Sequence, residues 1–411
     1  MPGKSGSQKI LTTGFLSAGS PVISFDGSSM LFSAQQEMDG PWQIWEMDFG
    51  SGGFRKVISL NENCTDPVYL PDGRIVFSRM TPRDTLTSDH QLFSCNSDGS
   101  DLRQLTFSPS HNLSTIVLAD GRLLTVSIQS YPERKEPMLM VLRPDGTKAD
   151  LFYKVSGNRT LMSGATETSD GRILFIESEK SGSRKGRIMS VSYNRPLHSG
   201  IEITRDLEGD FCSVFPSSRG KLLVSDRENA GGNYSLSEFD PSVNSLVKLV
   251  DTDPEYDITK ILITEVRNQP KKLPSEVDTN VKTGLLLCQD INFLNPFLAD
   301  STAGKARATQ IEVLGADTTY GIVDVESDGS FQLKVLADMP FRIMTLDRNG
   351  NRVNGPGSWL WLRPNERRGC IGCHEDPEMV PGNKVSLAIW KTPVIIPVHI
   401  NKVDEKTVEL E

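Results

Sequence analysis

The stretch Leu-Pro-Asp-Gly-Arg-Ile-Val-Phe at residues 70–77 sets the pattern for the first half of the chain. An apolar run leads into a turn that ends in glycine, and a second apolar run follows. Asp-Gly between two β-rich runs indicates a tight turn, because glycine accepts a positive φ without a steric penalty from Cβ. The stretch therefore predicts two antiparallel strands joined at Asp72-Gly73.

The same unit recurs along the first 250 residues. Further copies surround Asp26-Gly27, Asp120-Gly121 and Asp170-Gly171, and a degraded copy surrounds Gly220. The five turn glycines are 46, 48, 50 and 49 residues apart. Further apolar runs follow within the copies, at residues 91–93, 102–106 and 138–141. Four short strands in about 45 residues form the blade of a β-propeller. Residues 1–266 are therefore predicted to be a propeller of five to six blades.

Two segments bear on how the ring closes. We expect Gln8–Thr12 to form a fourth strand that completes the last blade and closes the ring. A sixth blade is either built from Tyr256–Val266 together with this N-terminal strand or is partly missing. The repeat resembles the TolB-like propeller family, chiefly through residues 70–77.

The composition of the sequence changes after Val266. Paired prolines at Pro270 and Pro274 predict an extended linker over residues 267–283. Alternating strands then predict a small β-sandwich over residues 284–358. Its expected strands are residues 285–288, 310–314, 322–325, 331–335 and 341–346. Asp328-Gly329 is expected to make a hairpin between the third and fourth of them. The whole chain is thus predicted to be all-β.

A motif with specific chemistry lies in the last segment, residues 359–411. Cys370-Ile371-Gly372-Cys373-His374 has the pattern of a c-type haem attachment site. Cys370 and Cys373 would add to the two vinyl groups of one porphyrin, and His374 would be the proximal ligand of the iron. The sequence therefore predicts one covalent haem c as cofactor.

Other interpretations of the motif remain open. A structural zinc site needs about four ligands, usually in two close pairs, whereas Cys64, Cys95, Cys212 and Cys288 are single and far apart in sequence. A thioredoxin-like dithiol needs a strand–motif–helix context, and a chance match is the third alternative. Cys64 and Cys95 lie in one repeat and either form a disulfide in an oxidising compartment or stay as buried thiols.

The residues around the motif suggest how it is presented. Pro364 suits the first turn of a helix, so a short helix ending before Pro377 is expected to carry the motif. Trp359 and Trp361 either cover a haem face or belong to an ordinary core. Three arginines either pair with the haem propionates or form solvated surface: Arg363, Arg367 and Arg368.

The sixth iron ligand has several candidates. His399 is the only histidine after the motif and lies in an apolar run, so it is either this ligand or an ordinary half-buried side chain. Met379 is close to His374 in sequence and would struggle to reach the opposite haem face. An open position would instead suit small-molecule chemistry. The remaining histidines are expected to be structural or solvated: His90, His111 and His198.

Composition narrows the class of protein. The 411 residues carry a formal net charge of −9, and no basic run extends beyond Lys271-Lys272 and Arg367-Arg368, which argues against nucleic-acid binding. No stretch approaches the ~20 apolar residues of a membrane helix. Haem attachment to this motif normally occurs outside the cytoplasm. We therefore expect a periplasmic or otherwise extracytoplasmic protein, although the N-terminal residues show no export signal.

The order of parts resembles the hydrazine synthase alpha-subunit family. The resemblance runs from the first repeat through residues 283–288 and 328–331 to 358–361 and the motif at 370–374. It implies a propeller, a β-rich middle domain, c-type haem and partner subunits. That family carries two haems, whereas this chain has one attachment motif. The resemblance therefore extends to architecture and haem ligation, and its catalysis is not carried over.

These observations lead to one prediction of function and two alternatives. We predict a periplasmic mono-haem c-type cytochrome-like protein that transfers electrons and whose propeller docks a redox protein partner. The first alternative is a haem-dependent oxidoreductase of the hydrazine synthase alpha-like type, acting on a small nitrogen or oxygen species. The second is a non-redox propeller scaffold. No residue is assigned a catalytic role, and no substrate is identified.

Overall fold

The structure is a computed structural model, and β-strands make up almost all of its regular elements. It describes residues 9–82, 88–182, 185–217, 220–229, 231–250, 255–294, 307–373, 378, 382 and 384–398. The chain divides into two compact units. Unit 1 consists of Met1–Gln104, Ser110–Pro144 and Asp150–Leu273, and unit 2 of Leu105–Pro109, Asp145–Ala149 and Pro274–Glu411.

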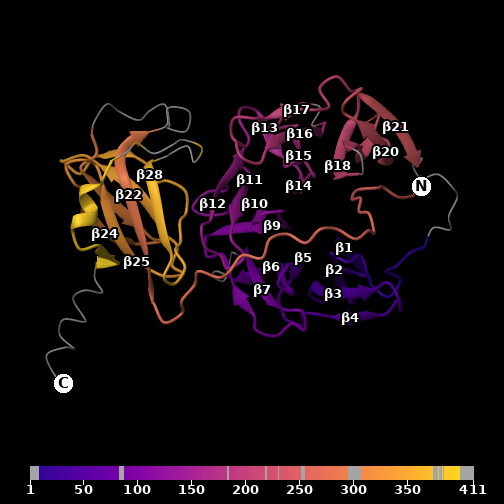
Figure 1. Cartoon of the computed structure of the whole chain (residues 1–411), viewed down its shortest axis with the longest axis horizontal. Coiled ribbons are helices and arrows are strands. Elements are labelled where there is room, and N and C mark those ends of the chain that lie inside the picture. The colour runs from indigo at the N-terminus through magenta and orange to yellow at the C-terminus, as the bar shows by residue number, and fades with distance from the viewer. Residues whose placement is uncertain are drawn as a thin grey trace. The chain divides into compact units, whose positions relative to one another are not determined.

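Unit 1 is a β-propeller whose blades follow the sequence repeat (Figure 1). Blade 1 contains β1 (Ser17–Ile23), β2 (Ser29–Gln35), β3 (Gln43–Asp48) and β4 (Phe54–Lys56). Blade 2 contains β5 (Cys64–Tyr69), β6 (Arg74–Pro82), β7 (Ser88–Asn96) and β8 (Arg103–Gln104). Blade 3 contains β9 (Ser110–Val117), β10 (Leu123–Gln129), β11 (Met138–Leu142) and β12 (Asp150–Lys154).

The last two described blades repeat the same antiparallel order. Blade 4 contains β13 (Arg159–Leu161), β14 (Thr166–Glu167), β15 (Arg172–Glu179), β16 (Arg187–Ser192) and β17 (Ile201–Glu202). Blade 5 contains β18 (Asp210–Pro216), β19 (Leu222–Arg227), β20 (Ser235–Asp240) and β21 (Ser245–Val250). The predicted all-β propeller is therefore confirmed, with five blades among the described residues.

Glycine turns join the strands within the blades, and their surroundings differ. Gly73 has a φ of 89° and open space where a Cβ would lie. Gly99 has a φ of 84°, and a Cβ there would lie 2.1 Å from the carbonyl oxygen of Val57. The first turn thus needs glycine for its conformation alone, and the second needs it also for close approach of the backbone.

Apolar clusters pack neighbouring blades together. One cluster joins Leu31 and Ile44 of blade 1 to Phe77 and Phe93 of blade 2. Others join blades 3 and 4 and blades 4 and 5. A separate cluster on blade 1 is covered by residues from outside the blades: Leu11, Phe15 and Leu262.

The predicted closing strand was wrong for the described residues, and so was the first of the two alternatives for a sixth blade, in which Tyr256–Val266 builds it. Residues 9–12 form no strand, and Leu11 packs on blade 1 instead of completing blade 5. The fourth place in blade 5 is already taken by β21, which pairs with β20. Tyr256–Val266 likewise forms no strand and therefore builds no sixth blade. The prediction for Gln8 lies outside the described residues.

Residues 255–273 instead form an extended segment that contacts turns of blades 1 and 3. The N–H of Arg267 donates to the carbonyl of Phe25 at 2.8 Å, and the N–H of Lys271 donates to the carbonyl of Ala119 at 3.0 Å. Backbone bonds to isolated turns do not amount to a ladder, which explains why this apolar segment fails to form strands. It is fastened to blade 1 and then to blade 3.

Unit 2 contains a sandwich of two four-stranded sheets (Figure 1), and it extends past the predicted residues 284–358, because residues 367–373 and 394–396 add strands to one of the sheets. In one sheet the order is β28 (Arg367–Cys373), β22 (Thr283–Leu294), β25 (Phe331–Leu336) and β29 (Val394–Ile396). In the other it is β24 (Thr319–Asp324), β23 (Gln310–Leu314), β26 (Arg342–Leu346) and β27 (Arg352–Asn354). A short 3-10 helix, η2 (Leu387–Trp390), precedes β29.

The predicted hairpin at Asp328-Gly329 was wrong, although the turn itself exists. Glu326 donates its N–H to the carbonyl of Ser330 at 2.8 Å, and Gly329 has a φ of 84°. The strands on either side belong to different sheets, because β24 pairs with β23 and β25 pairs with β22. The turn therefore carries the chain from one sheet of the sandwich to the other.

Candidate functional site

The segment that carries the haem motif is a strand. β28 pairs with β22 in parallel, and Cys288 of β22 is the neighbour of Cys370 in this ladder. The predicted short helix was therefore wrong. Asn365 has a φ of 66°, in the left-handed region, and this stops a helix directly after Pro364. Glycines at positions 369 and 372 weaken helix formation further.

Only part of the motif can be described. Cys370 is half-buried and packs against the apolar core of unit 2. Cys373 is the last residue of β28, but its side chain lies outside the described residues. His374 lies outside them altogether, as do both candidates for the sixth ligand, Met379 and His399.

The described part of the motif fits thioether attachment on one condition. The Cys370 thiol is partly accessible beside apolar side chains, as a porphyrin edge would require. Residues three apart in a strand point to opposite faces, so one porphyrin can take both thiols only if the backbone turns at Cys373. β28 ends at that residue, and its pairing slips there from Asp290 to Leu294 of β22. Attachment of both thiols to one porphyrin therefore requires a turn where β28 ends.

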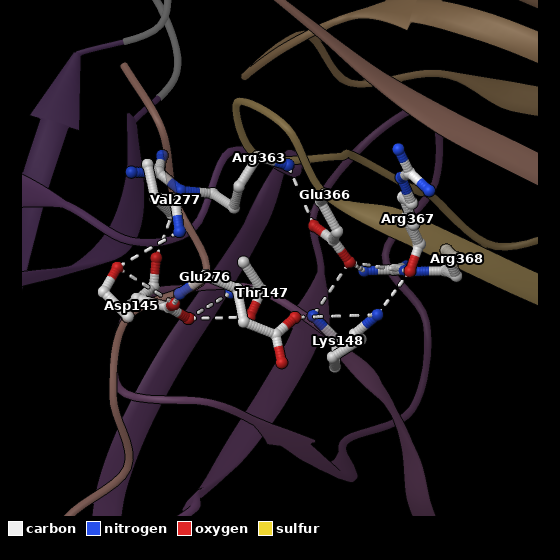
Figure 2. A network of polar contacts seen from close by, with 10 residues as sticks. Asp145, Thr147, Lys148, Glu276, Val277, Arg363, Glu366, Arg367 and Arg368 are labelled. Atoms are coloured by element: carbon white, nitrogen blue, oxygen red, sulfur yellow. Dashed lines mark hydrogen bonds and ion pairs between the residues drawn. The ribbon is translucent and has the colours of Figure 1, made fainter. Parts of the chain in front are cut away.

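A buried carboxylate anchors the chain just before the motif (Figure 2). Glu366 has none of its surface exposed, and its Oε1 accepts hydrogen bonds from Arg368 Nη2 at 2.8 Å and from the Lys148 N–H at 2.9 Å. Its Oε2 accepts the N–H of Arg363 at 2.9 Å. Lys148 Nζ also donates to the carbonyl of Arg367. Glu366 thus ties the start of β28 to the segment Asp145–Ala149 of unit 2.

A second carboxylate extends this network (Figure 2). Asp145 Oδ2 accepts the N–H of Glu276 at 2.7 Å and the hydroxyl of Ser275 at 3.2 Å, while its Oδ1 accepts two bonds from Thr147. Its carbonyl accepts Arg363 Nε at 3.2 Å. Three stretches of unit 2 that are far apart in sequence therefore meet at Asp145 and Glu366.

The flanking arginines and tryptophans have structural partners. Arg363 forms an ion pair with Asp338 at 2.8 Å and lies over the ring of Phe107. Burial lowers the pKa of Arg363, and Asp338 opposes that effect. Arg368 is paired with Glu366, so neither arginine is solvated surface as the sequence had allowed. Arg367 is exposed.

The two tryptophans before the motif belong to the interior of unit 2. Trp359 is 7% exposed and Trp361 is 2% exposed. The guanidinium of Arg342 lies 4.8 Å from the centre of the Trp359 ring. Their surroundings are therefore those of ordinary core residues.

Sequence reasoning missed the residues that fix the motif in place. Glu366 lies among three arginines, and a lone acid in a basic run is a usable sign of an internal ion pair. Asp145 precedes Gly146, and this common dipeptide indicates a turn but not an anchor. Lys148 gave no signal, because its role depends on segments more than 200 residues apart, as the separation of 218 between Lys148 and Glu366 illustrates.

The other expected sites can also be placed. Cys64 and Cys95 are both buried and form no disulfide, and burial raises the pKa of their thiols to about 12 and about 11. The described residues contain no cluster of three or more His, Cys, Asp or Glu arranged to hold a metal ion. None of the described helices is long and apolar enough to cross a membrane.

Comparison with known proteins points to one family. Residues 294–375 match the model of the hydrazine synthase alpha subunit middle domain. Hydrazine synthase subunit alpha of Kuenenia stuttgartiensis is 21% identical over 89% of this chain and 61% of its own length. The structure of Kuenenia stuttgartiensis hydrazine synthase superposes with a TM-score of 0.79 at 19% identity, over 93% of this chain and 66% of that one.

A more distant solved structure also matches. The putative TolB from Agrobacterium tumefaciens has a TM-score of 0.44 at 17% identity, over 57% of this chain and 80% of that one. This chain spans about three fifths of the length of the Kuenenia subunit that it matches. The matched middle domain contains β28 and the motif at residues 370–374. The chain therefore contains a region that matches the hydrazine synthase alpha subunit middle domain, and its fold is similar to that of the Kuenenia enzyme.

Proposed function

We propose that this chain carries one covalent haem c, held by thioether bonds to Cys370 and Cys373, with His374 as the proximal iron ligand. The attachment pattern is complete in the sequence. The half-buried thiol of Cys370, at an apolar core and close to the end of β28, is the observation that carries the proposal. A haem bound there would supply one-electron redox chemistry at its iron.

The protein's own residues would fix the site. Glu366, with its bonds from Arg363, Lys148 and Arg368, holds the start of β28 in one position. The parallel ladder with β22 then sets the direction of Cys370.

Intact mass tests the attachment. The exported chain is expressed with the cellular machinery that attaches haem c, alongside a known c-type cytochrome as a control for loading. We expect the mass of one haem on the wild type, and its loss in Cys370→Ser and Cys373→Ser. Cys212→Ser changes a half-buried cysteine in blade 5 and should keep the haem. A wild-type chain without added mass, beside a loaded control cytochrome, would overturn the proposal.

Electron transfer is the function we favour for this haem, with a redox protein as partner of the propeller and a periplasmic or otherwise extracytoplasmic location. A six-coordinate, low-spin optical spectrum is expected, since a closed iron suits electron exchange. If His399 is the sixth ligand, His399→Ala should convert this spectrum to a high-spin one. An unchanged spectrum would remove His399 from the site.

A second function is favoured by the family match over residues 294–375, which includes the motif. In this alternative the chain is a haem-dependent oxidoreductase that acts on a small nitrogen or oxygen species at an open iron position. The relative is named a subunit, so we propose that this chain also assembles with another protein. High-spin bands, together with a spectral shift on adding carbon monoxide to the reduced protein, would select this alternative.

A further inference from the structure

Two histidines face each other between blades 2 and 3 of the propeller. His90 lies on β7 and His111 on β9, and both side chains are half-buried. Their Nδ1 atoms are 3.0 Å apart, and the ring centres are 5.2 Å apart with the planes tilted by 56°. Neither residue takes part in the proposed haem site.

The geometry indicates a shared proton. The ring centres are farther apart than the nitrogens by about the radii of two imidazole rings, so the two nitrogens point at each other. Two nitrogens that bound one metal ion would converge on a point beside the line between them. The described residues also offer no third ligand in a metal-binding arrangement. A hydrogen bond between the two rings therefore describes the pair better than a metal ion does.

The pair lies within a polar seam. Asn112 Nδ2 donates to the carbonyl of His90 at 3.2 Å, and Gln91 Nε2 donates to the carbonyl of Ser110 at 3.3 Å. The hydroxyl of Ser130 donates to the carboxylate of Asp89. Three consecutive residues of β7 thus bind blade 3 through polar groups. This seam depends more on hydrogen bonding than the apolar cluster that joins blades 1 and 2.

We propose that His90 and His111 form a proton-sharing latch that holds blades 2 and 3 together near neutral pH and releases them in acid. When both rings are neutral, one Nδ1–H donates and the other Nδ1 accepts. A first added proton can enter at the outer Nε2 of the donor ring and leaves the bond intact. A second proton must occupy the accepting Nδ1, which removes the bond and places two like charges side by side.

The charged groups around the two histidines affect the pH at which the latch opens. Burial lowers the pKa of His90 and His111 lowers it further, while Asp66 and Asp89 raise it, with a net decrease. Asp66 also raises the pKa of Lys260, which burial lowers. Because burial and the neighbouring His111 hold the folded pKa of His90 below its ordinary value of 6.5, the neutral ring stabilises the seam above that pH. Stability is lost as the pH falls from that value through the lowered pKa.

Hydrogen exchange on the full-length chain tests the latch. We expect the amides of β7 and β9 to lose about tenfold in protection between about pH 7.5 and about pH 5, after correction for intrinsic exchange rates. In His111→Gln, which can still hydrogen-bond but brings no second imidazole to the seam, this loss should be clearly smaller, with the remainder due to the burial of His90. His198→Gln changes an exposed histidine of blade 4 and should behave as the wild type does.

A second measurement does not depend on how the variants fold. The chain has five histidines, so labelled imidazole nitrogens can be followed individually by nuclear magnetic resonance. Opposite tautomers at His90 and His111 are expected near neutral pH. The same tautomer at both rings, or equal loss of protection across all blades in acid, would overturn the proposal.

Discussion

At the scale of single residues, the position of the haem motif depends on a charge that is fully removed from water. Glu366 is unexposed, and bonds from Arg363, Lys148 and Arg368 compensate it. Replacing a whole buried ion pair by apolar side chains often changes the stability of a protein little. Removing only one partner leaves the other charge uncompensated. The network is therefore more important for specifying one arrangement of these segments than for overall stability.

Glu366→Gln should destabilise unit 2 by about 3 kcal/mol, because the amide cannot neutralise Arg368 and presents donors to donors. Urea unfolding followed by the fluorescence of Trp359 and Trp361 measures this change. Glu312→Gln is a matched control, since Glu312 accepts only an exposed hydroxyl bond from Thr319, and it should cost less than about 0.5 kcal/mol. Equal costs for the two variants would contradict the assignment of Glu366 as an anchor.

Asp328 gives unit 2 an acid-sensitive contact. Burial would raise its pKa, but bonds from Ser330 and the N–H of Leu387, with Lys384 nearby, outweigh this and hold it at about 2. The carboxylate stabilises the fold above its ordinary value of 3.8, and this contribution is lost as the pH falls from there to about 2.

We therefore expect unit 2 to lose about 2 kcal/mol over that interval. Asp328→Asn should remove most of this pH dependence, as measured by urea unfolding at several pH values. Asp324→Asn changes an exposed carboxylate nearby in sequence and should retain it. The assignment fails if both variants show the wild-type pH profile.

The chemistry of the candidate site could be predicted from the sequence only where it is local. The motif from Cys370 to His374 is contiguous, so spacing alone identifies it. The anchors Asp145 and Glu366 are brought together by folding, and no local pattern marks such pairs. Arg363 and Arg368 were expected to face a ligand or solvent, because a sequence does not show that buried carboxylates satisfy them.

At the scale of elements, the Asp-Gly turns explain why so much of the fold could be predicted. Each turn restricts the register of its two strands, and a repeated register gives repeated blades. Prediction failed where an element depends on a distant partner. β28 has the composition of a poor helix, but only its ladder with β22 makes it a strand. The turn at Asp328-Gly329 was recognised, whereas the change of sheet was not.

The turns also differ in how much stability the protein would lose if the glycine were given a side chain. Gly73→Ala should destabilise the propeller by about 1 kcal/mol, the penalty for a left-handed alanine in open space. Gly99→Ala should cost more than about 2 kcal/mol, because its Cβ would meet the Val57 carbonyl. Thermal unfolding of the two variants compares them directly. A similar cost for both would show that this close approach does not constrain blade 2.

At the scale of the whole molecule, blade 1 has an apolar face that no sixth blade covers in the described part of the chain. The ring of Phe15 packs edge-on against Phe32 at 5.3 Å, Trp45 at 5.0 Å and Phe54 at 5.4 Å. Leu11 and Leu262 cover the rest of this cluster. Two segments that belong to no blade thus replace a neighbouring sheet.

Phe15→Ala should therefore destabilise unit 1 by about 3 kcal/mol, through lost burial and three lost ring contacts. Leu16→Ala, at a neighbouring position that is 54% exposed, should cost less than about 0.5 kcal/mol. Denaturant unfolding followed by the fluorescence of Trp42 and Trp45 distinguishes the two variants. A small effect of Phe15→Ala would mean that this covering segment is dispensable.

The extended segment 255–273 has a mechanical consequence. Its bonds at Arg267 and Lys271 fasten the chain to the turns at Phe25 and Ala119 before it leaves unit 1. A pull on the chain beyond Leu273 would therefore load blade 3 first and blade 1 next, and would reach blade 5 only after both fasteners had broken. Blade 5 is thus shielded from tension by the bonds to blades 3 and 1, so stretching should detach residues 255–273 before it unfolds the propeller.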